Sequence, residues 1–527
     1  GFIVIKWLNL NWQWNKLAKH IHSCFSLYLA LACATIILNL LNTGITVFIV
    51  DTNHPLHFIM QFFAVAAFVM THLSAMTGGY HGFISTRSKM EASCGGDEAG
   101  ATWRFDCPIS DDNILVGKSK PDIRHFFKAT GIGAMLLLLA IAIYGPFIFL
   151  TAGTTFEYYI AGNLSIFGTS LILPVIFLLA RQVPRTKMKL HRGILIVIIV
   201  TSSTVATINA VPFLTSSSAV TSLEMQFNAS FGTSWRNTIP ASTSNHFRHR
   251  PVALKDIILT IPIPAVDEQF DIPYMQDKGR TLRFDWYAPR GASMTSNKLP
   301  TIIALHPGSW RYLDKGAWNV VPTSRYIADQ GFIVIDAQYG LHDDSAGAFT
   351  MRDMIMEIGT LTRFLEANAD TYHVDLSRTY FLGRSAGGQL ALVAGMAYQS
   401  PYFAGNFSTV LECRGIIAFY PPSDLKHLNN TAGMKLFGVP MEQMWHFNPV
   451  NLTTPTSPPA LLFHGTSDDV VPIRQSEYLQ QQMRSNGRTC ILGTLSGGGH
   501  LFDLFYNNFY NQICVYYVER FLVLTDG

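Results

Sequence analysis

Five apolar segments in the first 217 residues constrain the fold of this chain more than any other feature. Each has roughly 20 residues or more, enough for a helix to cross the ~30 Å hydrocarbon core of a bilayer. A surface helix of a soluble protein would instead carry charged residues along one face. The sequence therefore predicts an α-helical transmembrane domain with five spans, at residues 24–50, 56–76, 129–151, 158–180 and 193–214.

The composition supports dividing the chain into domains. The 527 residues are 49% hydrophobic and 14% charged, whereas about 25% are charged in typical soluble domains. The shortage of charge is concentrated before residue 217. A signal peptide explains at most the first segment, whose 27 residues exceed the length of a signal-peptide apolar region. We expect a membrane domain at 1–217, a linker at 218–252 and a second domain at 253–527.

The distribution of lysine and arginine predicts the orientation in the membrane. These residues occur before the first span and in the loops at 77–128 and 181–192, but not in the loops at 51–55 and 152–157. Cytoplasmic loops are enriched in lysine and arginine. With five spans, everything after residue 217 is then expected on the extracytoplasmic side.

Four Asn-x-Ser/Thr sequons lie in the segment assigned to that side, at Asn228, Asn406, Asn429 and Asn451. If they carry glycans, the compartment is the secretory pathway of a eukaryote, as the endoplasmic reticulum lumen or the cell exterior. If they do not, a bacterial periplasmic location stays open. The sequence begins at Gly1 without an initiator methionine, as expected of a fragment or a processed product.

The linker and the cysteines carry weaker signals. Residues 215–252 are rich in serine, threonine and asparagine, which predicts a flexible or surface-lying tether, followed by a strand at 256–265. Cys413, Cys490 and Cys514 form an odd set, which leaves a bridge between Cys490 and Cys514 open. No spacing indicates a metal site. The net charge of +3 does not indicate nucleic-acid binding.

Two histidines raise the question of a separate function for the membrane domain. His57 and His72 lie in or near the second span, where ionisable residues are functional candidates. Haem binding or transport would need a partner histidine at similar depth on another span, and the sequence offers none. Anchoring a catalytic domain near lipid is the simpler expectation.

A Gly-x-Ser-x-Gly motif at residues 383–387 provides the first catalytic signal. It lies between a predicted strand at 378–382 and a predicted helix that includes 389–394. Glycines permit the sharp turn from strand to helix that leaves the hydroxyl of Ser385 exposed. Because the motif also occurs in ordinary glycine-rich turns, its interpretation depends on catalytic partners elsewhere.

Two later segments supply those partners. Asp468 follows an apolar strand predicted from residue 461, and His500 follows a glycine run after another strand. Serine needs a base to remove its proton, and the histidine needs a carboxylate to orient it. The chain order Ser385, Asp468, His500 matches that of α/β-hydrolases. Asp469 is the rival for the carboxylate.

Residues from about 253 to 525 resemble an α/β-hydrolase of the hormone-sensitive-lipase and carboxylesterase (BD-FAE-like) group, which carries His-Gly-Gly-Gly-Trp-like and Gly-x-Ser-Ala-Gly-Gly motifs. The similarity extends to 331–339 and 419–425. The resemblance implies a mostly parallel sheet flanked by helices, and an ester hydrolase without metal or cofactor. Arg384 replaces an acidic residue or histidine, and is expected to alter the charge at the pocket mouth.

The resemblance places an oxyanion loop after the predicted strand at 301–305. Pro307 replaces the first glycine of that loop and has no N–H. The expected donors are therefore Gly308 and Ser309, together with Ala386 after the nucleophile. Trp310 is expected to contact substrate. His306 and His464 are expected to structure their loops.

The sequence therefore predicts a membrane-anchored serine hydrolase that cleaves carboxylic esters on the extracytoplasmic side, with a small-molecule or lipid ester and membrane lipid as partners. An insertion at 426–447 is expected either to cap an acyl pocket or to pack as an ordinary surface helix. The alternatives are an esterase for lipid or prenylated substrates, an exopeptidase of the same fold, and an inactive receptor or transporter scaffold.

Overall fold

The computed structural model describes residues 176, 184, 189–244, 246–259, 261–292, 296–317, 319–342, 349–403, 405–427 and 441–526. Apart from residue 176, the first four predicted spans lie outside these residues, as do His57 and His72. The fifth falls within α7 (Lys189–Leu214). Among the described residues, no helix is both long enough and apolar enough to span a bilayer.

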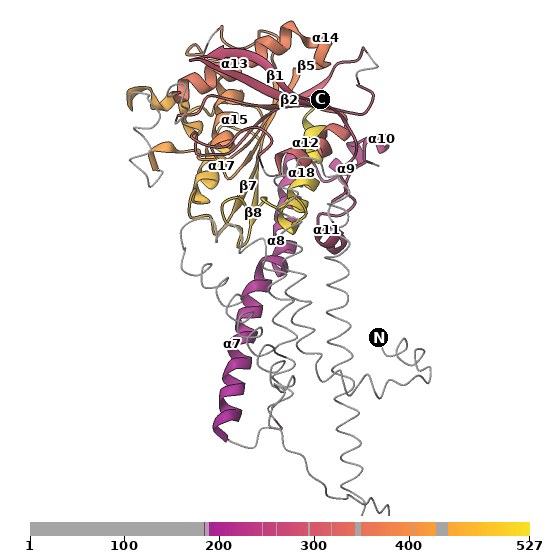
Figure 1. The fold of residues 1–527 in the computed structure, drawn as a ribbon, viewed down its shortest axis with the longest axis vertical. Coiled ribbons are helices and arrows are strands. Elements are labelled where there is room, and N and C mark those ends of the chain that lie inside the picture. Colours follow the sequence, from indigo (N-terminus) through magenta and orange to yellow (C-terminus); the bar gives the residue numbers. More distant parts are fainter. Residues whose placement is uncertain are drawn as a thin grey trace, which may run out of the picture. The chain divides into compact units, whose positions relative to one another are not determined.

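A mostly parallel, eight-stranded sheet forms the centre of the C-terminal part of the chain (Figure 1). Its order is β1-β2-β4-β3-β5-β6-β7-β8. Pairing is antiparallel from β1 to β2 and from β2 to β4, and parallel from β4 through β8. The strands are β1 (Asp267–Asp277), β2 (Arg280–Ala288), β3 (Leu299–Leu305), β4 (Ile333–Ala337), β5 (Val374–Arg384), β6 (Cys413–Phe419), β7 (Ala460–Gly465) and β8 (Cys490–Leu495).

Helices cover both faces of this sheet because its strands are apolar on both faces. In β3, Ile303 packs into one hydrophobic core and Ile302 into the other, as the two-residue period of a strand requires. The first core includes α13 (Met351–Ala367), α15 (Ala386–Ala397) and α17 (Arg474–Ser485). The second includes α8 (Ser216–Phe231), α12 (Val320–Asp329) and α18 (Phe509–Thr525). The predicted sheet flanked by helices is confirmed.

Short helices complete the described fold. They are α9 (Trp235–Thr238), α10 (Ala241–Ser244), α11 (Leu254–Leu259), α14 (Ala369–Tyr372), η4 (Leu425–His427), η5 (Met441–Phe447) and η6 (Pro449–Asn451). The parallel strands β3, β5, β7 and β8 end at the same edge of the sheet. The turns and loops that follow them, together with the first residue of α15, carry every site residue predicted from the sequence, so this edge positions the candidate site.

The segment predicted to be a flexible or surface-lying tether is packed structure, so the prediction of flexibility was wrong. Leu223, Phe227 and Trp235 are fully buried in the second core. The side-chain amide of Gln226 also pairs with the edge strand β8: its Nε2 donates to the Leu492 carbonyl at 2.9 Å, and the Leu492 N–H donates to its Oε1 at 3.0 Å. Apolar residues four apart within a polar composition identify one buried helical face.

The strand predicted at 256–265 was also wrong. Residues 254–259 form α11, and the described residues that follow, 261–266, have no regular secondary structure. The Asp256 carboxylate accepts a hydrogen bond from the Arg248 guanidinium at 2.9 Å. Pro262 and Pro264 have no N–H to donate to a strand partner. The sheet therefore begins only at β1.

The asparagines of the predicted sequons differ in their exposure to solvent. Asn406 is 6% exposed, and its Nδ2 donates to the Met356 carbonyl at 2.8 Å, so the folded chain has no room for a glycan there. The Asn228 Oδ1 accepts a hydrogen bond from the Trp235 indole at 3.0 Å. Asn451 is exposed, and Asn429 lies outside the described residues. The sequon at Asn406 therefore does not support glycosylation of the folded protein.

The three cysteines of the C-terminal part are free thiols: Cys413, Cys490 and Cys514. The bridge left open between Cys490 and Cys514 is therefore not formed. Burial raises the pKa of Cys413 and of Cys490 to about 12.

Candidate active site

Ser385 occupies a strained turn between β5 and α15. Its backbone has φ 51° and ψ −119°, a conformation that non-glycine residues rarely adopt. A Cβ on Gly383 would lie 2.1 Å from the Gly387 carbonyl oxygen, and a Cβ on Gly387 would lie 2.2 Å from that of Leu305. Only glycine fits at either flank, because each contact is with backbone.

The structure brings Ser385, His500 and Asp468 into one chain of hydrogen bonds. The His500 Nε2 lies 2.9 Å from the Ser385 Oγ, and the His500 Nδ1 lies 2.8 Å from the Asp468 Oδ2. All three side chains are buried. With the ring proton on Nδ1, His500 donates to Asp468 and accepts from the serine hydroxyl. Asp469 is exposed, so Asp468 is the carboxylate that contacts His500.

The environment of Asp468 keeps it ionised. Its Oδ1 accepts the backbone N–H groups of Val470 at 3.0 Å and Val471 at 2.8 Å. Burial opposes ionisation, but the electrostatic interaction with His500 and the hydrogen bonds from His464 and His500 outweigh it and hold the pKa of Asp468 well below its usual range. The negative charge is thus available to orient the imidazole.

His464 structures the loop that carries Asp468, as expected. Its Nδ1 lies 2.7 Å from the Ser476 Oγ, and its Nε2 lies 2.7 Å from the Val471 carbonyl oxygen. Its ring is buried at the end of β7. Each ring nitrogen therefore has a partner within the loop and the following helix.

The predicted oxyanion loop turns sharply after β3. Gly308, Ser309 and Trp310 have φ values of 132°, 53° and 60°, and the Gly308 carbonyl accepts the N–H groups of Arg311 and Tyr312, each at 2.9 Å. Within the described residues, the N–H groups of Gly308 and Ser309 have no acceptor. They are free to bind a negatively charged oxygen.

The third predicted donor, Ala386, is the first residue of α15, where helix N–H groups have no acceptor within the helix. The oxyanion loop and the serine turn are adjacent. A Cβ on Gly387 would meet the carbonyl oxygens of Leu305 at 2.2 Å and His306 at 2.4 Å. The two sources of N–H donors therefore lie against each other.

His306 fixes the start of this loop. Its ring stacks on that of Tyr339 with centroids 4.2 Å apart, and the Tyr339 hydroxyl donates to the His306 carbonyl at 2.8 Å. Burial lowers the pKa of His306 to about 4, so the ring is neutral at physiological pH. Its role is structural, as expected.

Trp310 connects the oxyanion loop to α15 and η5. It is 8% exposed, and its indole N–H donates to the Gln389 Oε1 at 3.0 Å. The Gln389 Nε2 donates in turn to the Phe447 carbonyl at 2.7 Å. A substrate contact for Trp310 stays a prediction. So does a cap at 426–447, where residues 428–440 lie outside the described residues.

Sequence reasoning missed a buried polar cluster behind the site. Arg384 is 1% exposed, and its Nε lies 2.7 Å from the Asp503 Oδ2. The expectation that it alters the charge at the pocket mouth was wrong, because its charge is buried and paired. The Tyr420 hydroxyl donates to the Asp503 Oδ1 at 2.7 Å. The available signal was an arginine in a buried strand, which requires a buried acidic partner.

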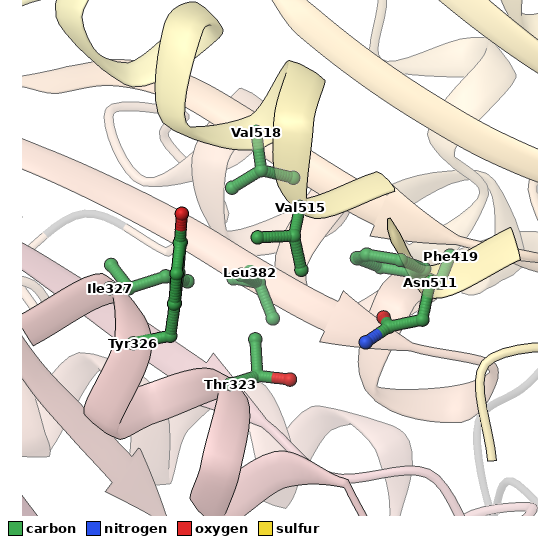
Figure 2. A pocket seen from close by; sticks show the side chains of 8 residues that line it. All are labelled: Thr323, Tyr326, Ile327, Leu382, Phe419, Asn511, Val515 and Val518. Carbon is green, nitrogen blue, oxygen red and sulfur yellow. The ribbon is translucent and has the colours of Figure 1, made fainter. Parts of the chain in front are cut away.

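A small cavity lies between α12, β5, β6 and α18 (Figure 2), and two of its lining residues, Thr323 and Phe419, also contact Arg384. Its volume is about 10 Å³, which is room for no more than one water molecule. It is therefore a packing defect and not a substrate pocket. Its walls are Thr323, Tyr326, Ile327, Leu382, Phe419, Asn511, Val515 and Val518.

No metal site is evident in the part of the chain that the structure describes. Among those residues, no three histidine, cysteine, aspartate or glutamate side chains gather closely enough to hold a metal ion.

Comparison with known proteins points to esterases. A family model described as BD-FAE matches residues 284–483. Esterase LipC of Mycobacterium tuberculosis is 24% identical over 230 residues, which cover 41% of this chain and 56% of the relative. The probable carboxylic ester hydrolase LipM of the same organism is 22% identical, with coverages of 44% and 56%. The chain spans about half the length of the curated relatives it matches.

Solved structures give weaker similarity. Esterase 2 of Thermogutta terrifontis, phosphoramylated by tabun, is 20% identical with a TM-score of 0.38, covering 46% of this chain and 87% of that one. A truncated carbohydrate esterase from gut microbiota is 19% identical with a TM-score of 0.38, with coverages of 48% and 96%. From the family match, the curated relatives and the sheet, the C-terminal half of this chain is similar to carboxylesterases of the α/β-hydrolase type.

Proposed function

We propose that this chain is a serine hydrolase that cleaves carboxylic esters. The observation that carries the proposal is the hydrogen-bonded series Asp468, His500, Ser385, with distances of 2.8 and 2.9 Å. It lies at the sheet edge next to N–H groups that have no acceptor among the described residues. The similarity to esterases supports the same class of reaction.

In the proposed acylation, the Ser385 Oγ attacks the acyl carbon while the His500 Nε2 takes the hydroxyl proton. Asp468 holds the Nδ1 proton and stabilises the imidazolium. The N–H groups of Gly308, Ser309 and Ala386 stabilise the oxyanion. Collapse of the tetrahedral intermediate transfers the proton from His500 to the departing alcohol oxygen.

Deacylation follows the same route in reverse. A water molecule gives its proton to the His500 Nε2 and attacks the acyl-serine carbon. The second tetrahedral intermediate collapses, the proton returns to the Ser385 Oγ, and the carboxylic acid leaves. His500 carries out every proton transfer in the proposed cycle, and the N–H groups contribute hydrogen bonds only.

Replacing the nucleophile tests this proposal. Ser385→Ala should lower ester turnover by about 10⁴-fold or more and abolish labelling by a fluorophosphonate probe, while the melting temperature changes little. The exposed Ser377 provides the matched control, and Ser377→Ala should retain both properties. Full turnover by Ser385→Ala would contradict the assignment. Absence of labelling in the folded wild type would favour the inactive scaffold.

The location of the domain is a separate proposal. The apolar segments before residue 217 and the basic loops between them favour a membrane-anchored chain with its hydrolase domain on the extracytoplasmic side. Protease added outside sealed vesicles whose extracytoplasmic face points outward should then digest the hydrolase domain. Protection until the membrane is dissolved by detergent would contradict this orientation.

The substrate class is proposed only as far as carboxylic esters, with lipid or prenylated esters as the alternative. A panel of esters of increasing acyl length, assayed on the full chain in bilayers and in detergent, separates the two. A preference for long chains that appears only in bilayers would favour a lipid substrate.

A further inference from the structure

The four buried polar side chains behind the site form one connected cluster, which we call the Asp503 cluster: Asn319, Arg384, Tyr420 and Asp503. Each is at most 3% exposed. Asp503 accepts all of its side-chain hydrogen bonds from the others, from Arg384 at 2.7 Å, Tyr420 at 2.7 Å and Asn319 at 3.1 Å.

Two of its members come from the segments that must meet for catalysis. Arg384 directly precedes the proposed nucleophile, Ser385, and Asp503 follows the proposed base, His500, by three residues. An isolated buried ion pair is weak evidence for stability, because desolvation offsets its attraction. The pair between Arg384 and Asp503 instead links two chain segments, one with Ser385 and one with His500. The distance between these segments decides whether the serine hydroxyl reaches the imidazole.

The loop that carries His500 depends on such contacts. Residues 496–508, between β8 and α18, form neither helix nor strand, so no regular hydrogen-bond ladder fixes the imidazole. Within this loop, both the carboxylate and the main-chain carbonyl of Asp503 are bonded, the latter to the Asn319 Nδ2 at 2.5 Å. Asp503 is therefore an anchor of the loop.

Tyr420 connects Asp503 to the imidazole of His500. Its ring centroid lies 4.6 Å from that of His500, and it has a φ of 40°, which costs free energy in a non-glycine residue. Burial and the charge of Asp503 raise the pKa of Tyr420 well above its usual value. The hydroxyl therefore stays protonated and donates to Asp503.

We propose that Asp503 is a positioning residue, which holds the Ser385 turn through Arg384 and the His500 ring through Tyr420. This inference rests on the proposed ester hydrolysis. Asp503 touches no reacting atom, and its effect is on the geometry of the serine–histidine hydrogen bond.

A tyrosine in an equivalent setting elsewhere provides a matched control. The Tyr326 hydroxyl donates to the buried Glu519 Oε2 at 2.7 Å, and Glu519 is itself paired with Arg520. Tyr420→Phe and Tyr326→Phe thus remove the same kind of bond, to a buried carboxylate with an arginine partner. Only the first removes it next to His500.

In the full chain, Tyr420→Phe should lower kcat by roughly 10- to 100-fold with KM unchanged, because small displacements of catalytic groups have effects of this size. The rate of fluorophosphonate labelling at Ser385 should fall by the same factor. Tyr326→Phe should keep the wild-type kcat. The two variants should lower the melting temperature by similar amounts, because each removes one buried hydrogen bond. Equal kcat values for the two variants would overturn the proposal.

A second pair of variants distinguishes a loss of positioning from a loss of stability. Asp503→Asn leaves the Arg384 charge buried without its partner, so its melting temperature should fall. The double variant Arg384→Gln/Asp503→Asn removes both charges and should regain melting temperature while kcat stays low. Recovery of wild-type kcat in the double variant would show that the ion pair does not position the site.

The failures of the two proposals are distinguishable. A folded wild type that neither hydrolyses esters nor reacts with the probe would contradict the proposed function, and the positioning role with it. An active wild type whose Tyr420→Phe variant is unimpaired would contradict the positioning role alone.

Discussion

At the scale of single residues, two neighbouring carboxylates have opposite surroundings. Asp468 is buried, with two backbone N–H groups on one oxygen and His500 on the other, whereas Asp469 is exposed. Both follow the same strand, β7. The difference arises because the loop turns back over Asp468, where the His464 ring holds the Val471 carbonyl at 2.7 Å.

Replacing each carboxylate by its amide should separate their roles. Asp468→Asn should lower kcat by about 10⁴-fold, the size of effect expected when an amide favours the wrong histidine tautomer. Asp469→Asn should retain nearly full activity, because its side chain does not contact His500. Steady-state ester hydrolysis at neutral pH measures both. Comparable losses in the two variants would contradict the assignment of Asp468.

At the scale of elements, the pairing of β2 with β4 places two acids side by side. Asp285 and Asp336 are direct cross-strand partners. The Lys315 Nζ lies 2.7 Å from the Asp285 Oδ1, whereas the Asp336 Oδ1 has no hydrogen-bond partner and its Oδ2 accepts the Gly316 N–H. Burial, reinforced by the charge of Asp285, raises the pKa of Asp336 to about 8.

This pair should make stability depend on pH. The folded chain keeps the Asp336 proton up to about pH 8, whereas the unfolded chain releases it near pH ~4. The folded state then binds more protons, so the free energy of unfolding falls as pH rises through this window. The amide in Asp336→Asn cannot titrate. The melting temperature of this variant should therefore fall less than that of the wild type as the pH rises through this window.

Asp353→Asn is the control for that measurement. The contacts of Asp353 with Lys278 and Thr350 outweigh burial and hold its pKa below the usual value. Its contribution to stability is present above the unfolded pKa and is lost only in acid, below about pH 4. An unchanged slope in Asp336→Asn between pH 5 and 8 would contradict the assignment.

The elements differ in how far the sequence could predict them. β3, β5, β7 and β8 were predictable, because strands buried on both faces are continuous apolar runs. α8 was missed because its serine- and threonine-rich composition was weighed above the spacing of its three buried apolar positions, which lie four residues apart. The contact between Arg384 and Asp503 was not predictable. It joins residues 119 positions apart, and no local pattern specifies such a pair.

At the scale of the molecule, the sheet domain extends further toward the N-terminus than the motifs suggest. Arg248 forms hydrogen bonds with two residues of α18. Its guanidinium donates to the Gln512 Oε1 at 3.0 Å, and its main-chain N–H donates to the Glu519 Oε1 at 3.0 Å. Burial of Leu223, Phe227 and Trp235 contributes on the order of 6 kcal/mol. A whole domain has a stability of only about 5–15 kcal/mol.

A chain that starts at residue 253 should therefore fail to fold. It lacks α8 and Trp235, which exposes the second core and the edge strand β8. A chain that starts at residue 204 keeps both and should be folded, with a cooperative melting transition. Soluble yield, near-ultraviolet circular dichroism and melting temperature measure the difference. Equal melting temperatures would show that residues 204–252 are dispensable.

The free thiols have a consequence for where this domain can be made. Cys413, Cys490 and Cys514 form no bridge, and the raised pKa values of Cys413 and Cys490 keep those two groups as unreactive thiols at neutral pH. Reducing agents have no covalent link to break in this part of the chain. The fold of this part of the chain thus needs no oxidation step, and these three cysteines are free thiols whether the compartment is reducing or oxidising.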